Sequence, residues 1–136
     1  MKVLIIAMQN GVSRENSTFV IKMVRCFEAN AGILSVIDLN RVARIASNEG
    51  VDKDTARESL VQAAYEGLYA MEEIFKSESV KVSIRTIEVS VPEDLITEIK
   101  KGSPDIICLM GPVDTLWLEM IRGSLAIPLV IVPQEK

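Results

Sequence analysis

The segment with the clearest potential for chemistry surrounds Gly111. An apolar run, Ile106-Ile107-Cys108-Leu109-Met110, leads directly into this glycine. A parallel α/β sheet builds phosphate-binding loops at such points, because glycine lets backbone amides approach an anion at the start of the next helix. Only sixteen residues separate Gly111 from Pro128, which opens the final apolar run. The strand and glycine therefore favour a phosphate site, and the short gap argues against a complete one.

The second chemical observation is an absence, since the chain of 136 residues contains no histidine. This excludes Ser-His-Asp and Cys-His sites, metal ligation by histidine, and the commonest general base near neutral pH. The two cysteines, Cys26 and Cys108, lie in apolar stretches without metal-ligand spacing. We interpret them as reduced core residues of a cytoplasmic protein. Any enzyme chemistry here would have to use carboxylates, lysine or backbone amides. We expect no metal site and assign no catalytic residues.

Composition narrows the class of partner. The chain is 49% hydrophobic and 25% charged, which is typical of one globular domain spanning residues 1–136. A net charge of −4 without a basic cluster argues against nucleic acid as a partner. No apolar run reaches the roughly 18 residues of a membrane span, so we expect no membrane partner. The apolar start is interrupted by Gln9-Asn10-Gly11, which favours a first strand over a signal peptide.

Apolar strands and amphipathic helices alternate along the chain. Strands are predicted over residues 2–8, 33–39, 81–89, 105–110 and 129–132. Helices are predicted over residues 16–30, from residue 55 for about twenty or more residues, over 92–102, and over 115–123. Residues 40–53 are expected to form a loop or a short helical turn. This alternation predicts a three-layer α/β/α domain with a five-stranded parallel sheet, in strand order 3-2-1-4-5 or 2-1-3-4-5.

Helix limits are predicted from capping residues and glycines. Thr55 with Glu58, and Ser90 with Glu93, match the Ser/Thr-x-x-Glu capping box. Gly102 is expected to end the helix that Ser90 begins.

The first helix is expected to begin with Asn16 or Ser17 as its cap and to end at Gly32. Its apolar face is predicted to carry Phe19, Met23, Cys26 and Phe27.

A ligand in such a sheet binds at the carboxyl ends of the strands, near the point where the strand order reverses. In the order 3-2-1-4-5 this point lies between the first and fourth strands. The candidate contacts are therefore Met8, Gln9 and Asn10 after the first strand, and Met110 with Gly111 after the fourth.

The chain resembles the universal stress protein family. The resemblance rests on three ordered segments: Val89-Ser90-Val91-Pro92-Glu93-Asp94-Leu95-Ile96, Pro104-Asp105-Ile106-Ile107-Cys108-Leu109-Met110-Gly111, and Pro128-Leu129-Val130-Ile131-Val132. They are similar to the family's "G-x-P-x-E-x-I" turn, "D-x-I-V-M-G" strand and "P-V-L-V-V" closing strand. The resemblance implies the 3-2-1-4-5 sheet of Rossmann-like type, cytoplasmic residence, and a homodimer formed through the last strand. That strand comprises Leu129, Val130, Ile131 and Val132.

Nucleotide-binding members of that family carry the motif G-x2-G-x9-G-S/T, whose amides hold the phosphates. Of its glycines only Gly111 is matched here, and Asp114 stands at the position of the second. Gly123-Ser124 lies four residues before Pro128, and we interpret it as the end of the last helix. Asp38 falls where the family's adenosine contact would lie. The resemblance therefore implies a variant with a degenerate motif that does not bind ATP tightly.

Two functions from different classes remain open. The first is a non-catalytic stress-response module that acts as a homodimer and binds an unknown protein partner or small ligand. The second is a nucleotide- or flavin-binding α/β domain with its ligand in the crevice between the first and fourth strands. For a flavin, Ser13, Ser17 and Thr18 after the first strand could supply the phosphate loop.

Overall fold

The computed structural model describes residues 1–8, 14–111 and 115–132. Its sheet has five parallel strands in the order β3-β2-β1-β4-β5, which confirms the predicted fold class and selects between the two predicted orders. The strands are β1 (Lys2–Met8), β2 (Asn30–Asp38), β3 (Val82–Val89), β4 (Ile106–Met110) and β5 (Leu129–Val132). The helices are α1 (Arg14–Cys26), α2 (Leu39–Glu49), α3 (Lys53–Ser77), α4 (Pro92–Gly102) and α5 (Thr115–Ser124).

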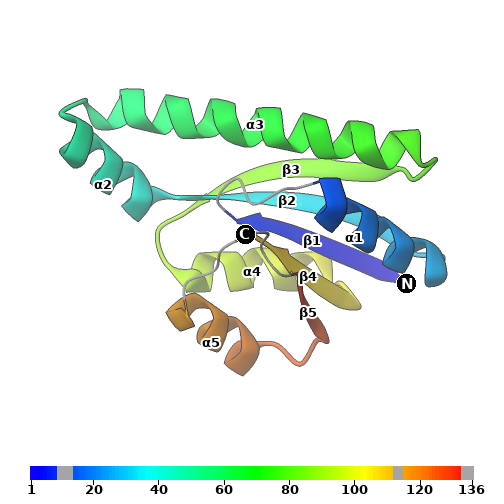
Figure 1. Cartoon of the computed structure of the whole chain (residues 1–136). Coiled ribbons are helices and arrows are strands. Elements are labelled where there is room, and N and C mark those ends of the chain that lie inside the picture. Colours follow the sequence, from blue (N-terminus) through cyan, green and yellow to red (C-terminus); the bar gives the residue numbers. More distant parts are fainter. Residues whose placement is uncertain (9–13, 112–114, 133–136) are drawn as a thin grey trace.

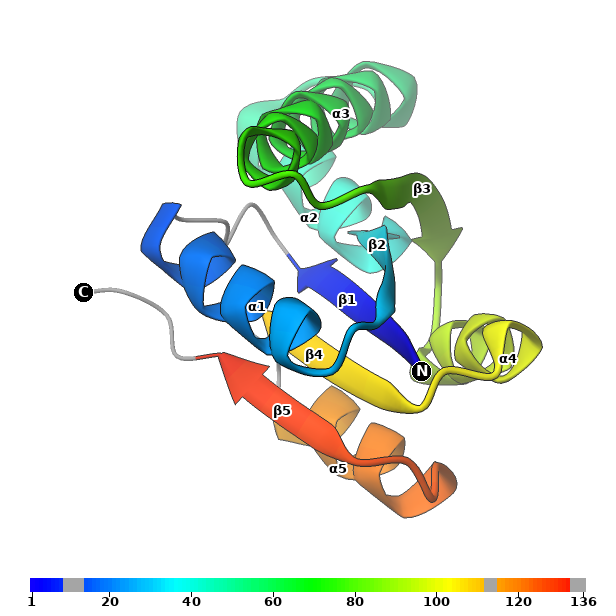
Figure 2. The same ribbon diagram turned by 90° about the vertical axis from the view of Figure 1, so that its right-hand side faces the viewer.

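Helices cover both faces of the sheet. Helices α1 and α3 lie on one face, α4 and α5 lie on the other, and α2 lies beyond the carboxyl end of β2 (Figures 1 and 2). Because the central strands are covered on both sides, they read as continuous runs of valine, isoleucine and leucine. No helix in the described ranges is both long and apolar enough to cross a membrane.

Two apolar cores hold these layers together. On the α1/α3 face, Leu68, Met71 and Phe75 of α3 pack with α1 against the sheet. On the α4/α5 face, Leu95, Ile96 and Ile99 of α4 and Ile121 of α5 pack against the opposite side of the same strands. Burial of these side chains is the main force that positions the strand ends described below.

The first helix differs from its prediction. It begins at Arg14 and ends at Cys26, so Ser17 lies inside it and is buried. Its buried face carries Val20, Ile21 and Val24, whereas Phe19, Cys26 and Phe27 are exposed. Two stripes of the helix are apolar at helical spacing, one that contains Phe19 and one that contains Val20. The β-branched stripe beside the small Ser17 lets the helix approach the sheet more closely than a phenylalanine stripe would.

Gly32 does not end a helix, because it lies within β2 between Leu4 and Ser83 on the neighbouring strands. A Cβ atom at this position would come within 3.0 Å of Ser83 Oγ.

The region expected to be a loop or a short helical turn contains the eleven-residue helix α2. Asp38 caps its start, and Gly50 ends it in a left-handed conformation with φ of 67°. Val42 and Ala46 are buried against Ala56 of α3 in a third, smaller core. These contacts explain why a polar segment forms a helix here.

The predicted capping boxes are wrong by a few residues. Asp52, rather than Thr55, caps α3, and its carboxylate accepts a 2.7 Å hydrogen bond from Thr55 N. For α4 the acceptor is Asp94 rather than Glu93, and it lies 3.0 Å from Ser90 N. The end of α4 at Gly102 is as predicted.

Candidate functional site

The carboxyl edge between β1 and β4 brings two predicted site residues together. Ala7 pairs with Met110 in register, so Met8 and Gly111 lie one residue further along neighbouring strands. Gly111 is buried and has φ of 92°, a conformation that favours glycine. The chain therefore turns tightly at this point, directly after β4.

Met8 contributes its backbone rather than its side chain to this edge. The side chain is only 5% exposed and packs in the core under α4 and α5. Gln9, Asn10 and Asp114, the other predicted contacts near Gly111, lie outside the described residues.

Asp38, the predicted adenosine contact, has a structural role at the end of β2. One carboxylate oxygen accepts a 2.9 Å hydrogen bond from Asn40 N, which caps α2. Asn40 in turn donates through Nδ2 to the carbonyl oxygen of Ser90 at 2.8 Å. Because Ser90 directly follows β3, this bond joins the start of α2 to the end of the neighbouring strand.

Sequence reasoning missed Asn40. The signal that could have found it is the aspartate two residues earlier, since Asp38 is a strong helix N-cap and predicts a helix start at this place.

A second polar contact ties α3 to the sheet near the same edge. Arg57 on α3 donates two hydrogen bonds to Glu88 on β3, one of them 2.9 Å long between Nη2 and Oε2. The bond from Arg57 lowers the pKa of Glu88, and the same pairing raises the pKa of Arg57. The pair keeps Glu88 charged and engaged, so it is a structural contact rather than a free acid or base.

The thiols and carboxylates offer no reactive cluster in the ranges that the structure describes. Burial raises the pKa of the Cys108 thiol to about 12, so this sulfur stays protonated at neutral pH. Within residues 1–8, 14–111 and 115–132 no group of three or more cysteine, aspartate or glutamate side chains is placed to hold a metal ion.

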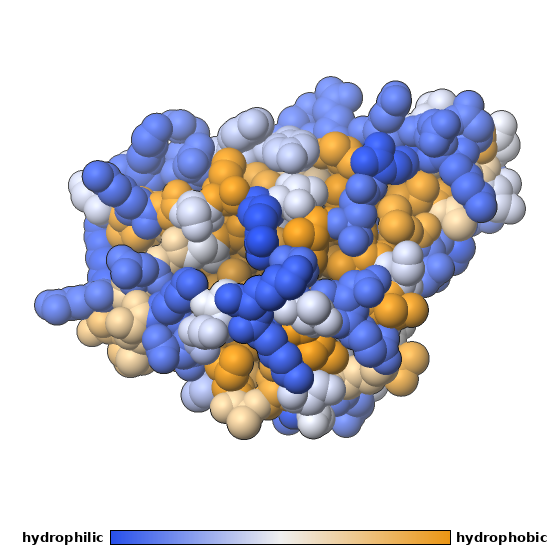
Figure 3. All heavy atoms as spheres, turned by 180° about the vertical axis from the view of Figure 1, so that it is seen from behind, coloured by the Kyte–Doolittle hydropathy of each residue, from blue (hydrophilic) through white to orange (hydrophobic). Residues whose placement is uncertain are grey.

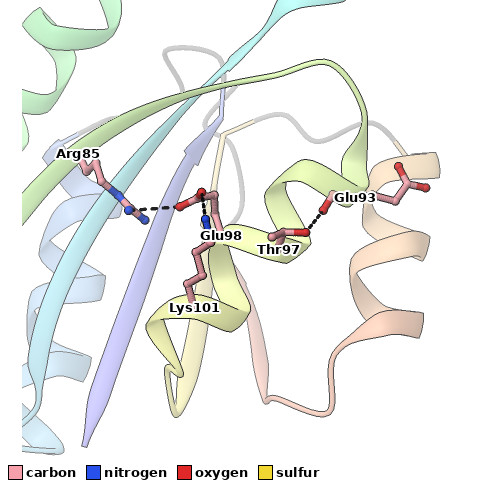
Figure 4. Close-up of polar contacts among 5 residues, drawn as sticks. All are labelled: Arg85, Glu93, Thr97, Glu98 and Lys101. Carbon is pink, nitrogen blue, oxygen red and sulfur yellow. Dashed lines mark hydrogen bonds and ion pairs between the residues drawn. The ribbon is translucent and has the colours of Figure 1, made fainter.

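A cavity of about 410 Å³ lies at the opposite, amino edge of the sheet. Its polar lining includes Lys2 and Arg85, and both are bonded within the chain. Lys2 Nζ donates to Gly102 O at 2.6 Å, and Arg85 forms a 3.2 Å ion pair with Glu98. Figure 4 shows Glu98 between Arg85 and Lys101, with Lys101 Nζ also 3.2 Å away. On the side of the molecule opposite to that seen in Figure 1, hydrophobic residues are interspersed with hydrophilic ones across the middle of the surface (Figure 3).

Solved structures supply the comparison for this fold, because no sequence-family model and no curated protein matches the chain. A universal stress protein family member from Burkholderia pseudomallei superposes with a TM-score of 0.72 at 14% identity, over 96% of this chain and 95% of that one. The universal stress protein from Archaeoglobus fulgidus in complex with dAMP gives 0.67 at 12% identity, over 98% of each chain. A family protein from Arabidopsis thaliana with AMP bound gives 0.58 at 11% identity, over 99% of this chain and 92% of that one.

The chain has the universal stress protein fold. At these identities the likeness establishes the architecture, and the site must be judged from the residues of this chain.

In the nucleotide-binding motif of universal stress proteins, the last glycine and the serine or threonine after it should stand before a helix. In this chain the corresponding pair lies at the end of helix α5. Gly123 and Ser124 form the last residues of α5, as predicted from the sequence. They lie roughly 14 Å along the helix from Thr115, which begins it near Gly111. The end of a helix carries carbonyl oxygens and a partial negative charge, which repel phosphate.

The last strand of this universal stress protein fold lies at one edge of the sheet. In the described residues β5 pairs only with β4, so its outer side has no strand partner. Ile131 is 49% exposed, Leu129 and Val130 are half-buried, and Val132 is buried. This geometry is compatible with the predicted dimer strand, and dimerisation itself stays a prediction.

Proposed function

We propose that this chain is a non-catalytic regulatory module of the universal stress protein kind, which works without tightly bound ATP. It acts by binding, as a cytoplasmic homodimer with an unknown protein partner or small ligand. The fold supports a module of the universal stress protein kind. The resemblance in sequence to that family supports a cytoplasmic location. The departure from the phosphate motif supports the absence of ATP.

The position of Gly123 and Ser124 carries the proposal. A phosphate loop presents backbone N–H groups at a helix start, and these residues sit at a helix end. The motif's remaining glycine position is occupied by Asp114, whose negative charge would repel phosphate. Gly111 keeps the first glycine of the motif, and its φ of 92° is a conformation that favours glycine.

The expected loss of affinity follows from these two positions. A micromolar ATP site is worth about −8 kcal/mol, and each hydrogen bond to a charged oxygen contributes roughly 1.5–3 kcal/mol. Two lost bonds leave between about −5 and −2 kcal/mol, which corresponds to a Kd of about 0.2 mM or weaker. Such a site would be largely empty in freshly purified protein.

Calorimetric titration with ATP tests this part of the proposal. We expect a Kd of about 0.2 mM or weaker, and no release of phosphate from ATP in a separate phosphate assay. Asp114→Asn should strengthen residual binding several-fold because it removes a repulsive charge, and Glu119→Gln on the exposed side of α5 is the matched charge control. Micromolar binding by the unaltered protein would overturn the proposal.

The homodimer is supported by a contrast between the two edges of the sheet. The outer strand β3 exposes Ser83, Arg85 and Glu88, which discourage pairing with another strand. The outer strand β5 consists of Leu129-Val130-Ile131-Val132 and carries no charge. An apolar edge of this kind must be paired or covered, and antiparallel pairing with a second β5 meets that need.

A nucleotide- or flavin-binding domain is the second candidate. The positive φ of Gly111 beside Met8 favours it, as do the dAMP and AMP complexes of the Archaeoglobus fulgidus and Arabidopsis thaliana proteins. For flavin the support is weaker, because Ser17 and Thr18 lie within α1 rather than in a loop. A rise in melting temperature with AMP, dAMP or FMN would favour this candidate over the first.

A further inference from the structure

Helix α1 exposes an apolar stripe that the described residues 1–8, 14–111 and 115–132 leave open. Phe19, Met23 and Phe27 recur every fourth residue, so they lie along one side of α1. Phe27 is the first residue after the end of the helix. Phe19 is 51% exposed and Phe27 is 45% exposed, while Met23 is half-buried. Two large aromatic side chains on one stripe are a feature of contact surfaces.

The stripe points away from α3. Arg25 of α1 forms a 3.3 Å ion pair with Glu78 at the end of α3, so this side of α1 faces that helix. At 3.6 residues per turn, Met23 and Phe27 lie about 160° around the helix from Arg25.

Contacts with the sheet give the direction in which the stripe faces. Met23 Sδ lies 4.0 Å from Cys108 Sγ on β4, and Cys108 pairs in register with Val130 on β5. Met23 and Val130 both pack against the same core cluster. Met23 therefore lies on the β5 side of α1, and Phe19 and Phe27 follow it one helical turn away on the exposed flank of the helix.

The other face of β5 is also apolar. Figure 2 shows α1 and α5 on opposite faces of the sheet at its β4–β5 end. On the α5 side, Ile131 is 49% exposed. Apolar side chains thus flank the outer strand on both faces.

We propose that Phe19, Met23 and Phe27, together with β5, form one contact surface for a second copy of this chain. The proposal rests on the β5 homodimer proposed above and adds α1 to its interface. A second copy related by a two-fold axis beside β5 would cover both parts of the surface. Its β5 would pair with the outer backbone groups of this β5, and its apolar side chains would pack on the stripe of α1. Pairing of β5 with a charged β3 edge would instead build an open chain of subunits.

The area of the stripe is large enough to matter. A phenylalanine side chain buries about 150–250 Å², so two that are half exposed add roughly 200 Å² per protomer. A stable interface buries about 800 Å² per partner. The two phenylalanines would therefore make up about a quarter of the contact, and β5 would supply a further part of it.

Sedimentation equilibrium of three variants tests the proposal. Phe19→Ser with Phe27→Ser should raise the dimer Kd at least roughly tenfold, since each change occurs twice in the dimer. Tyr65→Ser with Tyr69→Ser, which removes two exposed aromatic residues of α3, is the matched control and should leave the Kd unchanged. Ile131→Lys should give a monomer by placing a charge on the β5 edge. Circular dichroism and the melting temperature confirm that each variant folds.

The outcomes separate this inference from the dimer on which it rests. A dimer that is weakened by the phenylalanine changes and by Ile131→Lys, but not by the tyrosine changes, supports the whole surface. A dimer that Ile131→Lys abolishes and the phenylalanine changes leave intact overturns the role of α1 and keeps the β5 dimer. A wild-type monomer at high micromolar concentration overturns both.

Discussion

Replacing Asp38 by alanine distinguishes a structural carboxylate from a ligand contact. In the structure this side chain accepts a hydrogen bond from Asn40 N and caps α2. Removing such a cap costs about 1 kcal/mol. With an unfolding entropy of about 2.1 cal/mol/K per residue, the melting temperature of a 136-residue chain should fall by about 3–4 °C.

Two controls make this prediction specific. Asp38→Asn should stay within about 0.5 kcal/mol of the wild type, because asparagine caps a helix as well as aspartate does. Gly50→Ala, at the left-handed end of the same helix, should cost about 1–2 kcal/mol, because a side chain disfavours φ of 67°. Urea denaturation followed by circular dichroism measures all three.

An unchanged stability of the Asp38→Ala variant would contradict a structural role for this carboxylate. If Asp38→Ala keeps the melting temperature within about 1 °C of the wild type, the carboxylate does not stabilise α2 in solution. It would then be free for a ligand, and the nucleotide-binding candidate would gain support. Adding AMP to both proteins completes the test, since a cap has no reason to change a ligand-induced shift.

Further predictions follow from the ion pair, the thiols and the core. Glu88→Gln should cost about 0.2–1 kcal/mol at pH 7, because it breaks the half-exposed pair with Arg57. The pair lowers the pKa of Glu88, so its contribution to the free energy of unfolding is fully present above the unfolded pKa near 4.5. This contribution disappears as the pH falls through the lower pKa of the folded state. The urea midpoints of wild type and variant should therefore converge in acid. A disulfide reagent should modify Cys26 in the native protein and Cys108 only on unfolding, and fast native reaction of both would contradict the burial of Cys108. Phe75→Ala should cost about 3–5 kcal/mol in urea denaturation, and a loss below about 1 kcal/mol would contradict its full burial under α3.

The strands were the most predictable part of the fold. The limits of β1 and β5 are those expected from the apolar runs at residues 2–8 and 129–132. Strands buried on both faces leave little ambiguity, because nearly every residue in them is apolar. The strand order needed more than periodicity, which left two orders open. The resemblance to universal stress proteins selected the one that the structure has.

Helix faces and helix limits were less predictable for physical reasons. In α1 the stripe with Phe19 and the stripe with Val20 are both apolar, so the periodicity does not say which one meets the sheet. In α2 the stabilising contacts come from Ala56 on a different helix, and a local pattern does not contain them. Capping was misassigned because Asp52 and Asp94 compete with nearby serine, threonine and glutamate residues for the same backbone donors.

The candidate site was predictable in position and less so in chemistry. The sheet brings Met8 and Gly111 to adjacent strand ends, as the order of strands requires. Sequence did not show that the Met8 side chain is buried, or that Asp38 is bonded to Asn40. Both facts depend on packing between elements that are distant in the chain. Gln9, Asn10 and Asp114 lie outside the described residues, so their predicted contacts remain predictions.

Native mass spectrometry of the freshly purified protein tests most directly whether this chain is a homodimer that holds no ATP. One spectrum reports the number of chains in the assembly and any ligand that it retains. We expect a species of twice the chain mass without an added nucleotide. A monomer, or an assembly that carries the additional mass of ATP, would contradict the proposed function.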